Sequence, residues 1–185
     1  MNKIIILSII IVLAAFSCKN KLENEYIDKT DSLLVIVDDF LIEIQNIDID
    51  SIKIIQKQVT ENVEIFKNTY FEMPDDKQFM IDFGNYANVH KSIKHLLRDY
   101  NSLIKEINLS KTQITGLKHD LSHGLINGVD SIKIYFDDEH KAVNFMNAQI
   151  KSINEAVKKN KRLYKKLHDK MEKFKNDVVL KTDSE

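Results

Sequence analysis

Apolar residues recur at spacings of three and four along almost the whole chain after residue 23, and no useful stretch alternates between apolar and polar positions. Spacings of three and four place apolar side chains on one face of an α-helix, whereas a half-buried strand would alternate at every second residue. The pattern therefore predicts an all-α protein. It favours an elongated helical bundle with long, coiled-coil-like helices.

Two helices are predicted in the first part of the chain, over about residues 24–46 and 51–72. Asp50 or Ser51 can cap the second helix by accepting a hydrogen bond from a free backbone N–H. Pro74 forces the next boundary, because its ring clashes with a preceding helical turn. The apolar positions are Tyr26, Leu33, Val37, Phe40, Ile44 and Ile47, with Thr30 in the one gap, and then Ile52, Ile55, Val59, Phe66 and Tyr70.

A third helix is predicted over about residues 75–108, where Asp75 and Gln78 have the spacing of a capping box. Ser110 and Gln113 repeat that spacing, so we expect a new, shorter helix to begin there and to run to about Leu125. The third helix has a seam with a heptad repeat. Its members are Phe79, Phe83, Tyr86, His90, Ile93, Leu97, Tyr100, Ile104 and Ile107.

The last helix is predicted to begin near Asp130, after Asn127-Gly128, because both of those residues tolerate a left-handed backbone that ends a helix. It is longer than a small domain is wide, so we expect it to bend, break or overhang. Residues 180–185 should fray, which leaves one α-helical domain over residues 24–179. The seam of this helix is Val143, Met146, Ile150, Ile153, Val157, Asn160, Tyr164, Leu167, Met171, Phe174 and Val178.

The N-terminus has a different pattern, with Lys3 followed by an apolar run over residues 4–16 and then by small residues. A basic start, a short apolar run and a small-residue cleavage site are typical of a secretory signal peptide. The run is shorter than the roughly 20 residues that a membrane-spanning helix needs. We therefore expect a signal peptide over residues 1–17.

The only cysteine, Cys18, stands where this signal ends. The segment Ala15-Phe16-Ser17-Cys18 resembles the lipobox of bacterial lipoproteins, although Ala15 and the bulky Phe16 depart from its commonest form. The resemblance covers residues 1–22. It implies that Cys18 becomes the mature N-terminus and carries a diacylglyceryl group and an amide-linked acyl chain such as palmitate. It also implies a lipidated tether over residues 18–23 and a place in the bacterial cell envelope, periplasmic or surface-facing, with the membrane as partner. Ordinary secretion with Cys18 as a free thiol is the alternative.

Charge is segregated along the chain, although the total of 27 basic and 28 acidic residues leaves a net charge of -1. Residues 22–50 hold nine acidic residues and one basic residue, and residues 151–175 hold ten basic and three acidic residues. One interpretation is that the acidic first helix lies beside the basic end of the last helix. The other is an anionic partner such as lipid headgroups, polysaccharide or an acidic protein. Without a net positive charge, we expect no nucleic-acid partner.

The histidines are the one set of residues that suggests metal binding. His119 and His123 are four residues apart, so on a helix they share a face and could hold one zinc or copper ion. His140 could join them if the chain folds back at Asn127-Gly128. The glutamate that a zinc hydrolase places beside its first histidine is missing. A metal or small-ligand binding lipoprotein is therefore the alternative function, and surface histidines without a role are the simpler interpretation.

The sequence contains no G-x-S-x-G motif, no glycine-rich phosphate loop and no C-x-x-C-H motif. We therefore expect no enzymatic activity and no cofactor apart from the covalent lipid. The predicted function is a non-enzymatic module for protein or envelope interaction. If the end of the last helix lacks a partner within the chain, a stripe on it would bind a partner helix or a second copy. That C-terminal stripe is Tyr164, Leu167, Met171, Phe174 and Val178.

Overall fold

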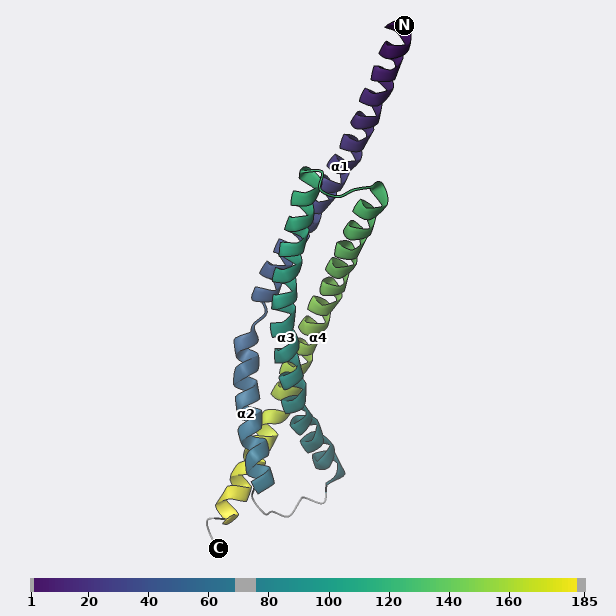
Figure 1. Cartoon of the computed structure of the whole chain (residues 1–185). Coiled ribbons are helices and arrows are strands. Elements are labelled where there is room, and N and C mark those ends of the chain that lie inside the picture. The colour runs from purple at the N-terminus through teal and green to yellow at the C-terminus, as the bar shows by residue number, and fades with distance from the viewer. Residues whose placement is uncertain (1, 69–75, 183–185) are drawn as a thin grey trace. The chain divides into compact units, whose positions relative to one another are not determined.

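The computed structural model describes the backbone of residues 2–68 and 76–182, and the side chains of residues 21–68 and 76–177. Within these ranges the chain forms four helices and no strand (Figure 1). The helices are α1 (Asn2–Gln45), α2 (Ile49–Asn68), α3 (Lys77–Ser122) and α4 (Val129–Thr182). The prediction of an all-α fold with long helices is confirmed. Tyr70, Pro74 and Asp75 lie outside the described residues.

The chain divides into two compact units. Unit 1 consists of Met1–Glu43 and Ile104–Ala148, so it contains most of α1, the end of α3 and the start of α4. Unit 2 consists of Ile44–Leu103 and Gln149–Glu185, so it contains α2, the start of α3 and the end of α4. The helix α4 does not break along its length. A single domain over residues 24–179 stays a prediction.

In unit 1, α1 runs antiparallel to the end of α3, as two ion pairs between them show. Asp31 pairs with Lys118, and Asp38 lies 2.6 Å from Lys111, so the partners advance in opposite directions along the two helices. The predicted seam of α1 faces this neighbour, and Val37 is fully buried. The core of the unit at the α3–α4 turn contains Leu117, Leu121, Ile126 and Ile132, with Tyr26, Ile27 and Phe136 packed against it.

A glycine ends α3. Gly124 has a positive φ of 63°, its N–H donates to the carbonyl of Leu121, and the N–H of Leu125 donates to the carbonyl of Asp120 at 2.9 Å. This is the Schellman pattern, in which a left-handed glycine lets the chain satisfy the last free carbonyls of a helix. The helix therefore ends before Leu125, earlier than predicted. Gly128, with a φ of 90°, immediately precedes α4.

In unit 2, α2 packs against the start of α3 and the end of α4. Four aromatic rings meet where the three helices lie together, those of Phe66, Phe79, Phe83 and Phe174. The centroid of Phe174 on α4 is 5.5 Å from that of Phe66 and 4.6 Å from that of Phe79. The predicted seams of α2 and α4 are buried here. Their buried members in this unit are Ile52, Ile55, Val59, Phe66, Ile150, Ile153, Val157, Asn160, Leu167 and Met171.

The residues that cap α2 and α3 differ from those predicted. Asp48, rather than Asp50 or Ser51, caps α2, because its carboxylate accepts hydrogen bonds from the backbone N–H and the hydroxyl of Ser51. At the start of α3, the carboxylate of Asp76 accepts from the N–H of Gln78 at 2.8 Å. In both cases the acidic residue stands directly before the first helical residue, where the N-cap belongs.

The prediction of a helix break at Ser110 is wrong, because α3 is continuous through it. Ser110 is buried and occupies a seam position, so the capping-box spacing is coincidental. The seam of α3 also lies one residue away from the predicted one over part of its length. Val89, Leu96 and Leu103 are buried there, and their predicted neighbours are half-buried. A helix that packs against two others covers a stripe wider than one seam.

Candidate functional site

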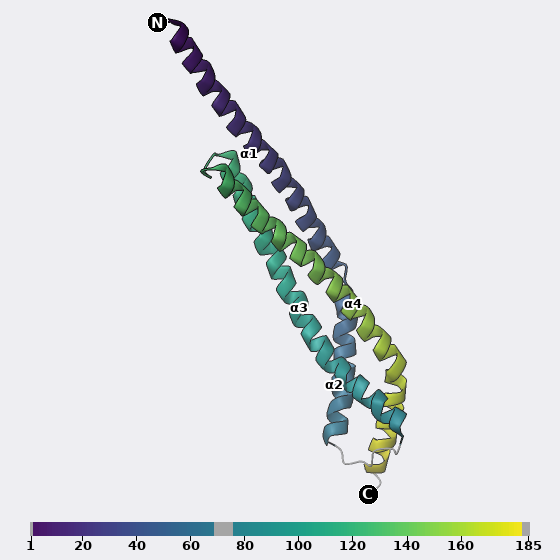
Figure 2. The same ribbon diagram turned by 90° about the vertical axis from the view of Figure 1, so that its right-hand side faces the viewer.

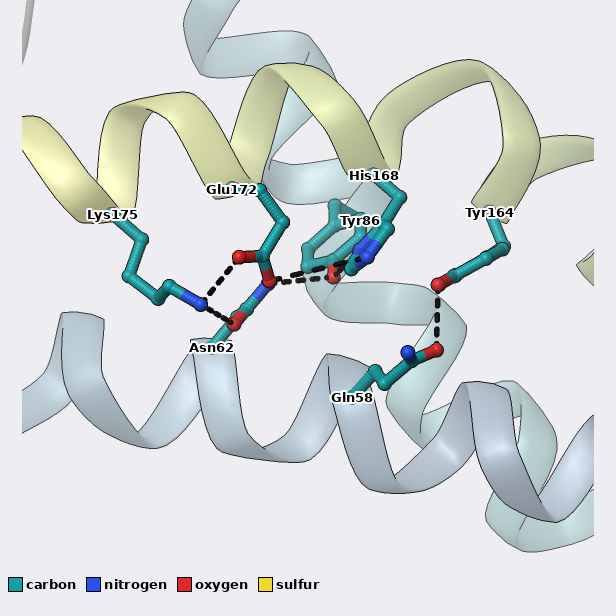
Figure 3. Close-up of polar contacts among 7 residues, drawn as sticks. All are labelled: Gln58, Asn62, Tyr86, Tyr164, His168, Glu172 and Lys175. Atoms are coloured by element: carbon teal, nitrogen blue, oxygen red, sulfur yellow. Dashed lines mark hydrogen bonds and ion pairs between the residues drawn. The ribbon is translucent and has the colours of Figure 1, made fainter.

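A cluster of hydrogen-bonded polar side chains lies in unit 2, where α2, α3 and α4 meet (Figure 3). Asn62 of α2 is at its centre and is 1% exposed. Its Nδ2 donates to the phenolic oxygen of Tyr86 at 3.0 Å and to the carboxylate of Glu172 at 2.7 Å, and its Oδ1 accepts from Lys175 at 3.2 Å. One amide thus joins α2 to both other helices.

Tyr86 links Asn62 to a histidine on α4. Its phenolic oxygen lies 2.9 Å from Nδ1 of His168, and Nε2 of that ring lies 3.9 Å from the carboxylate of Glu172. Burial raises the pKa of Tyr86, so the phenol keeps its proton and can donate a hydrogen bond to Nδ1 of His168. In that arrangement the other ring nitrogen of His168 carries its proton toward the carboxylate. Tyr86 is fully buried.

Glu172 is held as a carboxylate by its neighbours. Burial alone would raise its pKa, but hydrogen bonds from Lys175 and Asn62 outweigh burial, so the pKa of Glu172 lies below its ordinary value. Another carboxylate, that of the buried Asp82 of α3, lies 2.9 Å from the ammonium of Lys170. The hydrogen bond from Lys170 lowers the pKa of Asp82. Two lysines of α4 therefore balance two partly enclosed acidic groups.

A groove of about 570 Å³ borders the cluster, between α2 and α4 within unit 2. The hydroxyl of Tyr164 donates to the side-chain carbonyl of Gln58 at 2.6 Å, and the ring of Tyr164 stacks on that of His168 with centroids 4.4 Å apart. Lys161 and Lys165 also line the groove, and Lys161 pairs with Asp48 at 2.7 Å. The groove reaches one side of the cluster, at His168, but Tyr86 does not line it.

The C-terminal stripe belongs to the core of unit 2. Leu167 and Met171 are 2% and 0% exposed, while Tyr164 and Phe174 are half-buried and contact α2. The alternative in which this stripe is an exposed apolar surface is therefore wrong for these four residues. The reason is that α2 and the start of α3 supply the partner within the chain. The side chain of Val178 lies outside those that the structure describes.

The predicted metal ligands lie in unit 1 and are only partly brought together. The rings of His119 and His123 stack with centroids 4.2 Å apart, and Nδ1 of His123 lies 2.8 Å from the carbonyl oxygen of His119. His140 instead lies 3.3 Å from the amide of Asn144. Among the side chains of residues 21–68 and 76–177, no three His, Cys, Asp or Glu form a group able to hold a metal ion. Metal binding by this set stays a prediction.

The side chain of Cys18 lies outside those that the structure describes, and its backbone is part of α1. The residues of the expected tether, 18–23, are also helical. In the described part of the chain, none of the helices combines the length and the apolar character that crossing a membrane requires.

The charge pattern predicted that the acidic first helix lies beside the basic end of the last helix, but the acidic residue that contacts Lys161 is Asp48, which caps α2. Asp31 and Asp38 pair instead with lysines of α3.

The polar cluster was not predicted, although the spacing of apolar residues on α2 indicated that Asn62 would be buried. Asn62 stands three residues after Val59 and four before Phe66, where the seam of α2 requires a buried residue. A polar residue at such a position needs a hydrogen-bond partner.

The chain matches no known family model, no curated protein and no solved structure.

Proposed function

We propose that this chain is a non-enzymatic lipoprotein of the bacterial cell envelope, held at a membrane by lipid on Cys18 and acting through contact with proteins or other envelope components. The observation that carries the proposal is the lipobox-like segment that ends at Cys18, and the continuity of α1 supports it. The helix runs without a break from the apolar leader through residue 18 to Tyr26 and Ile27, which pack against the core of unit 1. A lipid on Cys18 would therefore be joined to the folded protein by a helix.

The polar cluster supports the non-enzymatic part of the proposal. The phenol of Tyr86 is fully buried and does not line the neighbouring groove, so a substrate in that groove would not reach it. Asn62, Tyr86, His168 and Glu172 are engaged with one another across three helices. Buried polar networks of this kind fix how helices pack, which is a structural role.

Acyl labelling tests the anchor. Cells expressing the full chain are grown with radiolabelled palmitate, and membranes are separated from soluble material. We expect label on the wild type in the membrane fraction, and no label on Cys18→Ala, which should be soluble or remain as uncleaved precursor. Asn20→Ala is the matched control and should behave as the wild type. A wild-type protein without label and with the same fractionation as Cys18→Ala would refute the lipoprotein proposal.

A further inference from the structure

The turn between α3 and α4 lies at the same end of unit 1 as Cys18. The ring of Tyr26 on α1 packs against Phe136 on α4 with centroids 5.3 Å apart. The two helices run in the same direction, because each is antiparallel to the end of α3. Val129, the first residue of α4, stands seven positions before Phe136, and residue 19 stands seven positions before Tyr26. Equal rise per residue therefore places the start of α4 level with residue 19.

The pairing of α1 with α3 independently places the turn at the same end of unit 1. Asp31 pairs with Lys118, and Ser122, the last residue of α3, lies four positions beyond that lysine. Four positions back along the antiparallel α1 is Ile27, so residues 123–128 of the turn extend from that level toward Cys18. Figure 2 shows the turn beside α1 at this level.

The turn is unusually apolar for an exposed loop. Residues 124–129 read Gly-Leu-Ile-Asn-Gly-Val and carry no charge. Ile126 points into the core and is 8% exposed, whereas Leu125 and Val129 are 59% and 57% exposed. Single exposed apolar side chains are common on protein surfaces, so the informative feature is that two of them stand on one uncharged turn. Two outward apolar side chains therefore stand at the end of unit 1 at which Cys18 lies.

Residues further along α4 suit a membrane interface. Tyr135 is 53% exposed, and Lys133, two positions earlier on α4, is also exposed. Tyrosine is enriched at the headgroup level of membranes, because its ring is apolar and its hydroxyl is polar. A lysine can lay its methylene chain along the apolar region and keep its ammonium in water. The exposed residues between Val129 and Tyr135 also include the acidic Asp130 and the apolar Ile134, which is 56% exposed.

We propose that the α3–α4 turn, through Leu125 and Val129, inserts into the headgroup region of the bilayer that holds the lipid of Cys18. This inference rests on the proposed function, because it requires an anchor at residue 18. Two attachment points, the lipid and the turn, would fix the direction in which unit 1 stands on the membrane. A single attachment point would leave the unit free to tilt.

An environment-sensitive probe tests this insertion. The lipidated full chain has no free thiol, because the sulfur of its one cysteine carries the diacylglyceryl group, so Leu125→Cys introduces a unique site for a nitrobenzoxadiazole (NBD) label. The protein is reconstituted into vesicles of phosphatidylethanolamine and phosphatidylglycerol. We expect the emission of the probe at Leu125→Cys to shift to the blue and to be lost when nitroxide-labelled lipids are included. Far-UV circular dichroism checks that the helical fold is retained.

The matched control is Ile42→Cys, which labels another exposed apolar position of unit 1, 24 residues after Cys18 on α1. Its probe should show neither the shift nor the quenching. Labelling of the wild type, or failure of the protein to sediment with vesicles, would refute the anchor and with it the premise. A sedimenting protein whose Leu125→Cys probe behaves as the Ile42→Cys control would overturn the insertion alone. A blue shift without vesicles that depends on protein concentration would show that a second copy covers the turn, and would also overturn it.

Discussion

The side-chain amide of Asn62 on α2 donates a hydrogen bond to the phenolic oxygen of Tyr86 on α3 at 3.0 Å, and both residues are buried in unit 2. The same amide also bonds to Glu172 and Lys175 of α4. One side chain therefore bonds to two other helices, and its removal would take a hydrogen bond from a partner on each of them. This makes Asn62 the residue through which the cluster is most directly tested.

We expect Asn62→Ala to lower the free energy of unfolding by about 2–4 kcal/mol, because buried polar groups lose their partners and a cavity remains. Tyr86→Phe should cost about 1 kcal/mol, since Asn62 keeps its bond to Glu172. Urea unfolding of the full chain in detergent, followed by circular dichroism, measures both. Asn101→Ala, at an exposed position of α3, is the control. An Asn62→Ala variant as stable as this control would contradict the role of the cluster.

Acid should destabilise unit 2. Hydrogen bonds from Lys161 and Ser51 lower the pKa of Asp48 to about 2, and the pKa values of Asp82 and Glu172 are also lowered. A group whose pKa is lower in the folded than in the unfolded chain stabilises the fold above its ordinary pKa. This stabilisation is lost as the pH falls through the folded value. The urea midpoint should therefore fall between about pH 4.5 and pH 2.

Removing one partner tests the cause of that acid sensitivity. Lys170→Met deletes the ammonium that lies 2.9 Å from Asp82, so the loss of stability on acidification should become smaller. Lys173→Met removes an exposed lysine of the same helix and should leave the pH dependence as it is. Equal pH dependence in the two variants would show that the Asp82–Lys170 pair is not responsible.

Leu167→Asp should unfold unit 2. Leu167 is 2% exposed, and an unpaired carboxylate in that position would lose its hydration, at a cost of several kcal/mol. Ile54→Asp introduces the same charge at a side chain that is 60% exposed, and should change the melting temperature little. Sedimentation of both variants accompanies the melting curves. A Leu167→Asp protein that melts as the wild type but no longer associates would mean that the C-terminal stripe binds a partner after all.

Ser110 is a position where a smaller change should stabilise the protein. Its hydroxyl oxygen is buried and, among the residues that the structure describes, has no hydrogen-bond partner. Ser110→Ala removes this hydroxyl from a seam position, so we expect a gain of up to about 1 kcal/mol in the free energy of unfolding. Ser102→Ala, at an exposed position of the same helix, should be close to neutral. A clear loss of stability in Ser110→Ala would indicate that a water molecule or another group satisfies the hydroxyl.

Replacement by alanine should change the free energy of unfolding in opposite directions at Gly116, inside α3, and at Gly124, just after its end. Gly124 has a φ of 63°, where a Cβ is strained, so Gly124→Ala should cost about 1 kcal/mol. Gly116 lies inside the helix with nothing near the place of a Cβ, so Gly116→Ala should stabilise by about 0.5–1 kcal/mol. Differential scanning calorimetry of the pair measures both effects. The same sign in both variants would contradict the Schellman ending of α3.

The spacing of apolar residues was enough to predict the helical residues of α1 after residue 23, α2 and α4, together with their buried faces, although it did not predict that α3 is continuous. Val37, Val59 and Ile150 are each fully buried at predicted seam positions. These features are local, because a period of three and four residues determines which side chains share a face before any partner is known. The same reasoning predicted a turn after α3 at Asn127-Gly128, and Gly128 has a left-handed backbone, but the glycine that ends α3 is Gly124.

Only the tertiary structure decided which helices meet. The residues of the polar cluster come from three helices, and Asn62 and Glu172 are 110 positions apart, so no local pattern could pair them. The same holds for Asp31 and Asp38, whose partners are on α3 and not on the basic end of α4. The tertiary structure also decided that Val89 and Leu96 belong to the buried seam of α3 and that Leu167 is buried. An apolar stripe indicates that a helix face is buried, but only the packing of the helices shows which neighbour buries it.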